Sequence, residues 1–359
     1  MGEFIRFYSW GLSMKFHMAV YTLALVFFKA IFNALAGEGS VSSLTMLQML
    51  LVSMAVAILE SFLFPEGREL EPSALRVRTV WWGLLCNLGF VGGALAKVEP
   101  KTCFLARGEN LAAILKDGLT VESDRLGRFC VVPVLATDDA RQIGVADAVI
   151  LAVKGYDLEQ SCRQIAPMVG PATVVLPLLN GVTVSQVMEP LLPPCILADG
   201  CINVFSHLAQ PGRVRQEGKS CRIVLGMTSG KLPPELLTLG LELEHAGIPV
   251  EATRDIAQAS WVKYTLMCGN SVALARFDVT AGDVQKDPQK LNFLRSAYGE
   301  LVSVAEAMGV SMPEGLVEQY MSNFLALPPD TMTSLYRDLK NGRRKNELSH
   351  IVGRLVELA

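Results

Sequence analysis

Long uncharged stretches dominate the first part of the chain. Residues 16–28 carry no charged side chain, the apolar run resumes after Lys29 as far as residue 36, and residues 39–59 form a second stretch of 21 residues without a charge. About 20 apolar residues in a helix are enough to cross the hydrocarbon core of a bilayer. The pattern predicts two membrane-spanning helices within residues 1–78. Two buried helices of a soluble domain are the alternative.

A third uncharged run covers the 18 residues 79–96. It fits either a third span or a strand, a loop and a helix. Lys and Arg precede the first expected span and follow the second, at positions 6, 15, 68, 76 and 78, whereas the connection 37–43 has none. By the positive-inside rule, both ends of the expected hairpin lie on the cytoplasmic side.

From residue 80 onward the pattern changes to short apolar runs rich in β-branched residues. These runs alternate with helical periodicity and lie at 80–86, 102–105, 130–134, 148–153 and 173–178. Strands that alternate with helices are typical of a parallel sheet with crossover helices. The chain is therefore predicted to be an α/β protein from this point on.

Composition supports a chain with two kinds of segment. Hydrophobic residues make up 51% and charged residues 19%, and charge is sparser before residue 98 than after it. The net charge of −3 comes without a basic block, which argues against a nucleic-acid partner. The eight cysteines form no C-x-x-C pair, so neither a metal site nor a disulfide framework is indicated, and reduced cytosolic thiols fit best.

The first apolar run leads into a glycine-containing segment, Asn87-Leu88-Gly89-Phe90-Val91-Gly92. With glycine in place of Asn87 it would read G-x-G-x-x-G, in which the glycines allow a tight turn, a close approach to pyrophosphate and helix packing on the sheet. A membrane helix that contains glycines explains the segment equally well. The second run ends at Arg107, which is suited to a 2′-phosphate; a solvated loop arginine is the alternative.

Several short motifs together resemble the ketopantoate reductase (2-dehydropantoate 2-reductase) family. They are GFVGGALA at 89–96, FLARGENLAAI at 104–114, AVKGY at 152–156, LNG at 179–181, PGRV at 211–214, WVK at 261–263 and SLYRDLKNGRR at 334–344. They occur in the family's order and cover about three quarters of the chain. Residues 1–78 lie outside the resemblance.

The resemblance implies a Rossmann-type, doubly wound parallel sheet over residues 79–250 and an all-helical domain over residues 251–359. It also implies NADPH and a 2-keto acid in the cleft between them, with reduction of ketopantoate to pantoate for pantothenate and coenzyme A synthesis. Relatives continue past the helix at 350–358, so a truncated helical domain is expected. With the bilayer as partner of residues 1–78, two spans place the reductase in the cytoplasm. Without that segment the protein would simply be cytoplasmic.

The resemblance also implies the catalytic residues. Lys263 matches the lysine that donates a proton or hydrogen bond to the keto oxygen, a role that suits a cation beside a developing alkoxide. Glu347 matches the family's glutamate near the substrate. Taken alone, Lys263 on an amphipathic helix and Glu347 in a highly charged segment would be interpreted as solvated surface residues.

Further residues are assigned to the cleft in the same way. Asn180 and Lys154 match residues that line the nicotinamide and substrate cleft, and Ser334 matches a residue that holds the substrate carboxylate. Asn180 with the following glycine would otherwise be an ordinary turn, and Lys154 a charge at a strand end. With Arg107, Gly89, Gly92 and Asn87, these residues complete the expected cofactor and substrate sites.

Three departures from the family pattern bear on activity. Asn87 stands where the first glycine of the fingerprint is expected, which threatens the tight turn. The segment between Gly93 and Arg107 is about one helical turn shorter than usual. Met267 and Ser271 stand where the family has substrate-contacting asparagines, with Ser271 the remaining polar candidate. Two alternatives remain for the function. The protein could reduce another 2-keto acid, or it could be a non-catalytic membrane protein with a degenerate reductase domain.

Overall fold

The computed structural model describes residues 79–82 and 86–358, which belong to one compact unit. The two membrane spans expected within residues 1–78 lie outside the described residues. Among the helices that the structure describes, none combines the length and the apolar character needed to cross a bilayer.

Within residues 79–96, for which a third span was the alternative, the structure describes a strand and a helix. Strand β1 (Thr79–Trp82) pairs within a sheet, and helix α4 (Cys86–Val98) has 13 residues. A helix of that length spans about 20 Å, which is too short for a hydrocarbon core of about 30 Å. The three-span alternative is therefore wrong, and the apolar residues Phe90, Val91, Ala94 and Leu95 of α4 are buried in the protein core.

Six parallel strands form the first sheet. They are β1, β2 (Cys103–Leu105), β5 (Leu135–Thr137), β6 (Ala148–Leu151), β7 (Val174–Pro177) and β8 (Ile196–Leu197). Their order is β5-β2-β1-β6-β7-β8, and all neighbours pair in parallel. In chain order this reads 3-2-1-4-5-6, the Rossmann arrangement, and it confirms the expected α/β fold.

Four of the five expected strands contribute to this sheet, but the run at 130–134 does not. Its first two residues end strand β4 (Gly127–Val131), which pairs antiparallel with β3 (Leu119–Ser123) in a different sheet. The parallel position is taken by β5, which was not expected as a strand. The run was misassigned because its apolar residues lie at an exposed edge, where Val132 is 81% exposed.

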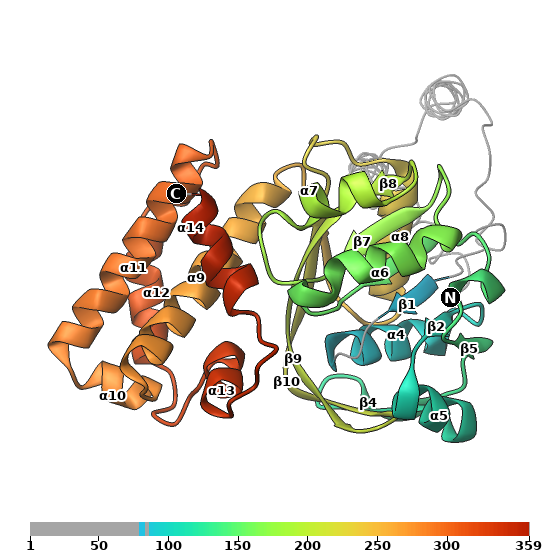
Figure 1. Cartoon of the computed structure of the whole chain (residues 1–359), viewed down its shortest axis with the longest axis horizontal. Helices are drawn as coiled ribbons and strands as arrows, with labels where there is room; N and C mark the ends of the chain where they lie inside the picture. The colour runs from blue at the N-terminus through green and yellow to red at the C-terminus, as the bar shows by residue number, and fades with distance from the viewer. Residues whose placement is uncertain (1–78, 83–85, 359) are drawn as a thin grey trace, which may run out of the picture. The chain divides into compact units, whose positions relative to one another are not determined.

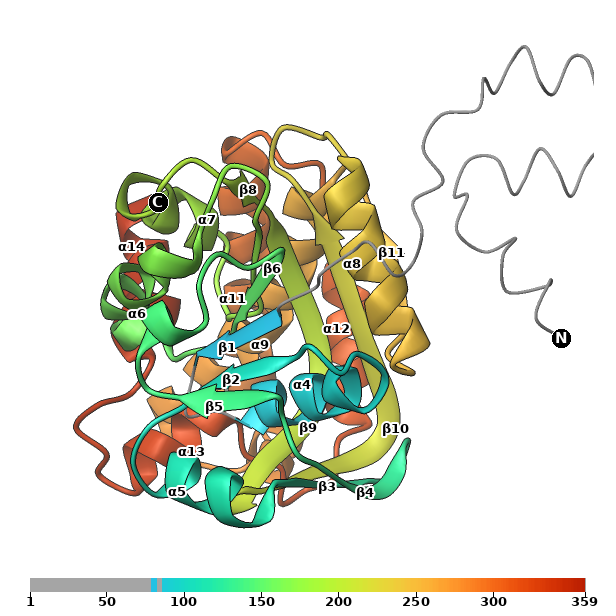
Figure 2. The ribbon, with the colours of Figure 1, turned by 90° about the vertical axis from the view of Figure 1, so that its right-hand side faces the viewer.

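The second sheet, which the apolar pattern did not predict, contains β3, β4, β9 (Asp199–Gln210), β10 (Arg213–Gly226) and β11 (Val250–Ala252). The long β9 and β10 form an antiparallel pair that runs past the first sheet (Figure 2). Helix α4 packs against this sheet: a Cβ at Gly89 would lie 2.3 Å from Val214 Cγ2, and one at Gly93 would lie 2.4 Å from Val121 Cγ2. Both glycines therefore allow close packing of helix and sheet.

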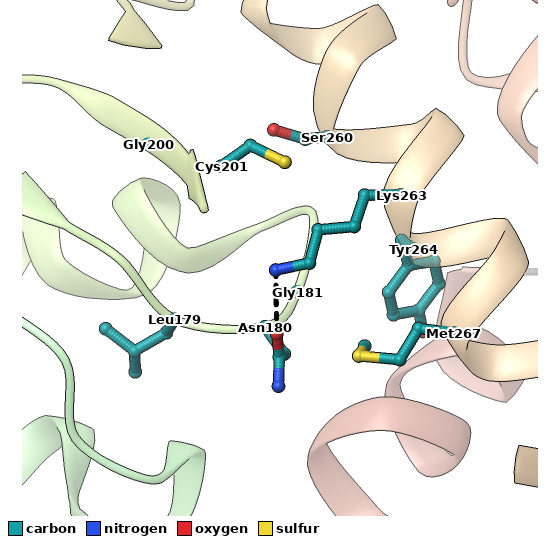
Figure 3. A pocket seen from close by; sticks show the side chains of 9 residues that line it. All are labelled: Leu179, Asn180, Gly181, Gly200, Cys201, Ser260, Lys263, Tyr264 and Met267. Atoms are coloured by element: carbon teal, nitrogen blue, oxygen red, sulfur yellow. Dashed lines mark hydrogen bonds between the residues drawn. The ribbon is translucent and has the colours of Figure 1, made fainter. Parts of the chain in front are cut away.

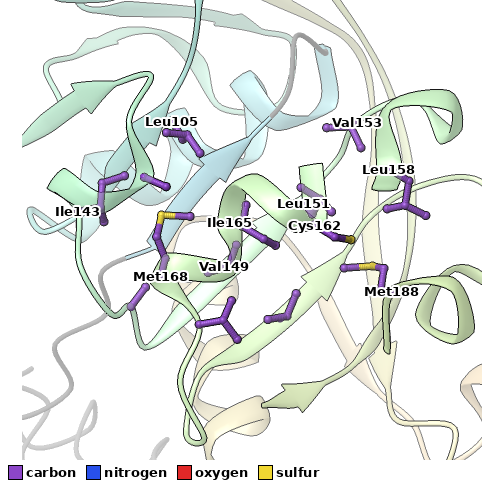
Figure 4. Packing of buried hydrophobic residues seen from close by; sticks show 14 of the residues in the cluster. Leu105, Ile143, Val149, Leu151, Val153, Leu158, Cys162, Ile165, Met168 and Met188 are labelled. Carbon is purple, nitrogen blue, oxygen red and sulfur yellow. The ribbon is translucent and has the colours of Figure 1, made fainter. Parts of the chain in front are cut away.

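Four more helices belong to the sheet-containing half of the unit: α5 (Gly108–Asp117), α6 (Leu158–Ile165), α7 (Val184–Met188) and α8 (Pro234–His245). Helix α6 illustrates why they form. Leu158, Cys162 and Ile165 recur at helical spacing and are buried against Val149 and Leu151 of β6 (Figure 4). Burial of each large aliphatic side chain contributes about 1.5–3 kcal/mol.

The chain continues into helices: α9 (Ile256–Phe277), α10 (Ala281–Gln285), α11 (Pro288–Ala307), α12 (Leu316–Leu325), α13 (Ser334–Lys340), a π-helical turn (Ser349–Gly353) and α14 (Arg354–Leu358) (Figure 1). The Asp255 side chain caps α9 by accepting from the Gln258 amide, and Asp278 ends it with a left-handed φ of 53°. Helix α9 packs on α11, α13 and strand β9, which places it at the junction of the two halves.

Candidate active site

The carboxyl edge of the first sheet brings together three of the expected site residues. Arg107 follows β2, Lys154 follows β6 and Asn180 follows β7. The strand order reverses between β1 and β6, and ligands of such sheets bind outside the carboxyl ends of the strands at this reversal. Lys154 therefore lies at the position where the fold itself favours a ligand.

Lys263 projects from α9 towards this edge and contacts Asn180. Its Nζ donates a hydrogen bond to Asn180 Oδ1 over 3.0 Å, and the two side chains point towards each other in Figure 3. The next residue, Gly181, has a φ of 141°, which an L side chain rarely adopts. The glycine lets the chain turn sharply after β7, so that Asn180 faces α9.

The pocket around this pair draws its walls from three segments. They are the loop after β7, the start of β9 and one face of α9, and the lining residues are Leu179, Asn180, Gly181, Gly200, Cys201, Ser260, Lys263, Tyr264 and Met267. The pocket volume is about 10 Å³, which is roughly enough for one water molecule.

Burial lowers the pKa of the Lys263 ammonium. Desolvation by the surrounding protein lowers its pKa, while the negative charge of Glu347 acts in the opposite direction. A lysine whose ammonium is less favoured than in water gives up its proton more readily. Burial also raises the pKa of the Cys201 thiol, so that it stays neutral.

A second pair of expected residues meets at the same edge. Lys154 Nζ lies 2.5 Å from Glu347 Oε2, and the side chains are 21% and 5% exposed, respectively. The ion pair joins the loop after β6 to the segment between α13 and the π-helical turn. A carboxylate this deeply buried requires such a partner. Lys345 lies over the Tyr156 ring at 5.8 Å and adds a second contact between the two segments.

Two of the expected substrate residues lie elsewhere. Ser334 is the exposed first residue of α13, where Thr333 supplies the cap by accepting from the Tyr336 amide. Ser271 is 1% exposed and lies two turns beyond Lys263 on α9, and it does not line the pocket. Neither residue is among those that line the pocket around the Lys263–Asn180 pair.

The glycine segment takes a form that differs from the expected one. Asn87 and Gly89 both lie in the first turn of α4, and Gly92 is buried within the same helix. Gly89 allows close packing of α4 against Val214 of the second sheet. In the fingerprint, the middle glycine instead allows the backbone to approach the pyrophosphate of the cofactor. What this geometry retains of the fingerprint is a helix that begins four residues after the end of β1, with its N-terminus at the carboxyl edge.

Arg107 stands at that edge with an exposed side chain and is the residue that precedes α5. Gly108 follows with a φ of 58° and open space around it. An exposed guanidinium at the end of the second strand fits a phosphate on the adenosine ribose of a dinucleotide. The strand order, the start of α4 and Arg107 are thus compatible with a bound dinucleotide.

Two polar residues of the pocket were not expected from the sequence. Ser260 lies three residues before Lys263 on α9, and Cys201 comes from β9. The spacing of Ser260, Lys263 and Met267 along one helix face could have identified the serine. Cys201 had no such signal, because it reaches the pocket through a sheet that the apolar pattern did not predict.

Comparison with known proteins gives a family for this fold and site. Residues 89–230 match the family model described as ketopantoate reductase PanE/ApbA, and residues 255–359 match the one described as ketopantoate reductase PanE/ApbA C terminal. The two matches cover most of the chain, and the chain belongs to the ketopantoate reductase family.

Individual relatives are distant in sequence, but the matches cover most of each relative's length. A 2-dehydropantoate 2-reductase of Halobacterium salinarum is 29% identical over 75% of this chain and 88% of its own. An uncharacterized oxidoreductase of Bacillus subtilis, YkpB, is 25% identical over 76% and 88%. The crystal structure of a PanE/ApbA family ketopantoate reductase from Ralstonia eutropha JMP134 superposes with a TM-score of 0.70 at 26% identity, over 78% of this chain and 90% of the other.

Proposed function

We propose that this protein reduces the keto group of a 2-keto acid of the 2-dehydropantoate type, with NADPH as the reductant. The observation that carries the proposal is the Lys263–Asn180 hydrogen bond, which holds a desolvated ammonium at the carboxyl edge of a Rossmann sheet. Family membership and the names of the relatives support this choice of reaction.

Lys263 is the residue that handles the proton. When NADPH is bound, its dihydronicotinamide supplies the hydride for the keto carbon. The keto oxygen would accept a hydrogen bond from a second N–H of the Lys263 ammonium, which has three donors, while Asn180 Oδ1 keeps the one it accepts now. As charge develops on the oxygen, Lys263 stabilises it and transfers a proton, and water restores the proton afterwards.

Asn180 is the residue that aims this lysine. Its amide oxygen holds Nζ in place, and the positive φ of Gly181 fixes the loop that carries the amide. A preorganised donor stabilises developing charge without having to reorient during the reaction. Asn180 would therefore act both on the lysine, through its amide oxygen, and on the ligand, through its amide nitrogen.

Two residues would hold the cofactor at the edge, and Glu347 acts on the lysines beside it. Arg107 would bind the 2′-phosphate, and Lys154 would contact the cofactor from the loop at the strand reversal. Glu347 neutralises Lys154 and raises the pKa of Lys263 through its charge. It thereby couples the segment before the π-helical turn to both lysines.

The test is 2-dehydropantoate-dependent oxidation of NADPH by the purified full-length chain. Lys263→Ala is the control, and circular dichroism and NADPH binding verify that both proteins fold. Turnover that falls at least about a hundredfold in the variant is the expected result. A folded wild-type chain without turnover would contradict the proposal and favour a degenerate reductase domain.

A further inference from the structure

The two sides of Lys263 along α9 differ in polarity. Ser260 lies three residues before the lysine and Met267 four residues after it, so all three share one face of the helix. Both neighbours line the pocket, and Figure 3 shows the Ser260 hydroxyl near Cys201 and the Met267 thioether on the opposite side of Lys263. A keto group held by Lys263 therefore has a hydrogen-bonding neighbour on one side and an apolar one on the other.

Tyr264 extends the apolar side. Its hydroxyl donates to the backbone carbonyl of Ile351, and its side chain is only 2% exposed. The edge-to-face contact with Trp261, at 5.5 Å between ring centroids, holds the ring in place. The hydroxyl is therefore already used within the protein, and the part of Tyr264 that remains for a ligand is the ring.

The chemistry of a 2-keto acid decides how it fits between these two sides. Its keto carbon carries a carboxylate on one side and a substituent on the other. A carboxylate against Met267 and the Tyr264 ring would lose water without gaining a donor, which costs several kcal/mol. The substituent must therefore face Met267, and the carboxylate must face the side of Ser260.

Resting on the function proposed above, we propose that Met267 makes the site selective for 2-keto acids whose substituent is purely apolar. A hydroxyl on the substituent would lie against the thioether and the ring without a partner. Such a group disfavours binding and the transition state alike, and an apolar wall typically discriminates against an added hydroxyl by about 10- to 100-fold.

A matched pair of substrates isolates this effect. They are 2-dehydropantoate and its 4-deoxy analogue, in which a methyl group replaces the hydroxymethyl group. The two differ by a single oxygen, and the carboxylate and keto group are identical. We expect the deoxy analogue to have a kcat/KM about 10- to 100-fold higher in the full-length chain with NADPH.

Two variants of one residue provide the controls. Met267→Asn supplies an amide that can hydrogen-bond the hydroxyl, so the preference for the deoxy analogue should shrink to less than about threefold or reverse. Met267→Leu keeps the wall apolar at similar volume, so the preference should remain. A merely structural effect of position 267 would change both substrates equally in both variants.

Binding without turnover separates this inference from the proposed function. Dissociation constants of both keto acids are measured by calorimetry in the presence of NADP⁺, where no hydride can be transferred. Tighter binding of the deoxy analogue without any turnover supports the selectivity and contradicts the function. If both keto acids are turned over with equal kcat/KM, or if 2-dehydropantoate has the higher kcat/KM, the selectivity is overturned and the proposed function stands. A folded chain that binds neither acid overturns both.

Discussion

Lys154 and Glu347 form a buried ion pair that joins two segments almost two hundred residues apart, with 2.5 Å between Nζ and Oε2. One partner follows a strand of the Rossmann sheet, and the other precedes the π-helical turn near the end of the chain. The pair therefore connects the sheet edge to the helical half beside the Lys263 pocket. The ion pair should therefore contribute to the free energy of unfolding of the protein.

Removing the lysine of this pair should destabilise the fold. Lys154→Met leaves Glu347 buried without a partner, and we expect the free energy of unfolding to fall by about 2–4 kcal/mol. Urea unfolding of Lys154→Met, Glu347→Gln and the double variant measures the coupling. A double variant less stable than the sum of the single effects would contradict a favourable pair.

The glycine at position 89 should be required for packing, independently of any cofactor. Gly89→Ala places a Cβ within 2.3 Å of Val214 Cγ2, and we expect a loss of about 1–3 kcal/mol in the free energy of unfolding. Val214→Ala removes the opposing methyl groups. If packing is the reason, the double variant recovers part of the stability that Gly89→Ala loses, as measured by thermal unfolding.

Arg107 should determine the choice between the two nicotinamide cofactors. Removal of a guanidinium that binds a 2′-phosphate costs about 1.5–3 kcal/mol, because charge-assisted hydrogen bonds are lost. We expect Arg107→Ala to lower kcat/KM for NADPH by about 10- to 100-fold and to leave that for NADH nearly unchanged. An equal loss with both cofactors would place the phosphate elsewhere.

The pH dependence of turnover should reflect the buried ammonium. Burial lowers the pKa of Lys263, and the protonated form is the proton donor, so kcat/KM should fall as pH rises through a value below that of an ordinary lysine. Asn180→Asp places a negative charge at the hydrogen-bonding position and should move this alkaline limb to higher pH. If kcat/KM falls at the same pH in both proteins, Lys263 is excluded as the titrating group.

The parallel sheet could be predicted from the sequence because its strands are buried on both faces. Ala148 through Leu151 are each at most 3% exposed, and such strands appear as continuous apolar runs. Strands β9 and β10 could not be found in this way. They mix exposed polar residues with buried ones and depend on pairing with distant strands, which leaves no continuous apolar run.

In the candidate site, too, some residues could be predicted from the sequence and others could not. Lys263 and Asn180 belong to short motifs that could be matched to a family, and the structure places them in contact. Ser334 matched equally well but lies exposed at the start of α13. Cys201 was missed because pocket walls depend on how distant segments approach each other, and that approach is set by tertiary packing that no local pattern records.

The most direct test of hydride reduction at Lys263 follows a deuterium atom. The full-length chain is incubated with NADPH that carries deuterium at the transferable position, together with 2-dehydropantoate or its deoxy analogue, and the product is analysed by mass spectrometry and NMR. We expect a 2-hydroxy acid with one deuterium on C2, and a rate that falls at least about a hundredfold in Lys263→Ala. A product without deuterium, or an unchanged rate in the variant, would contradict it.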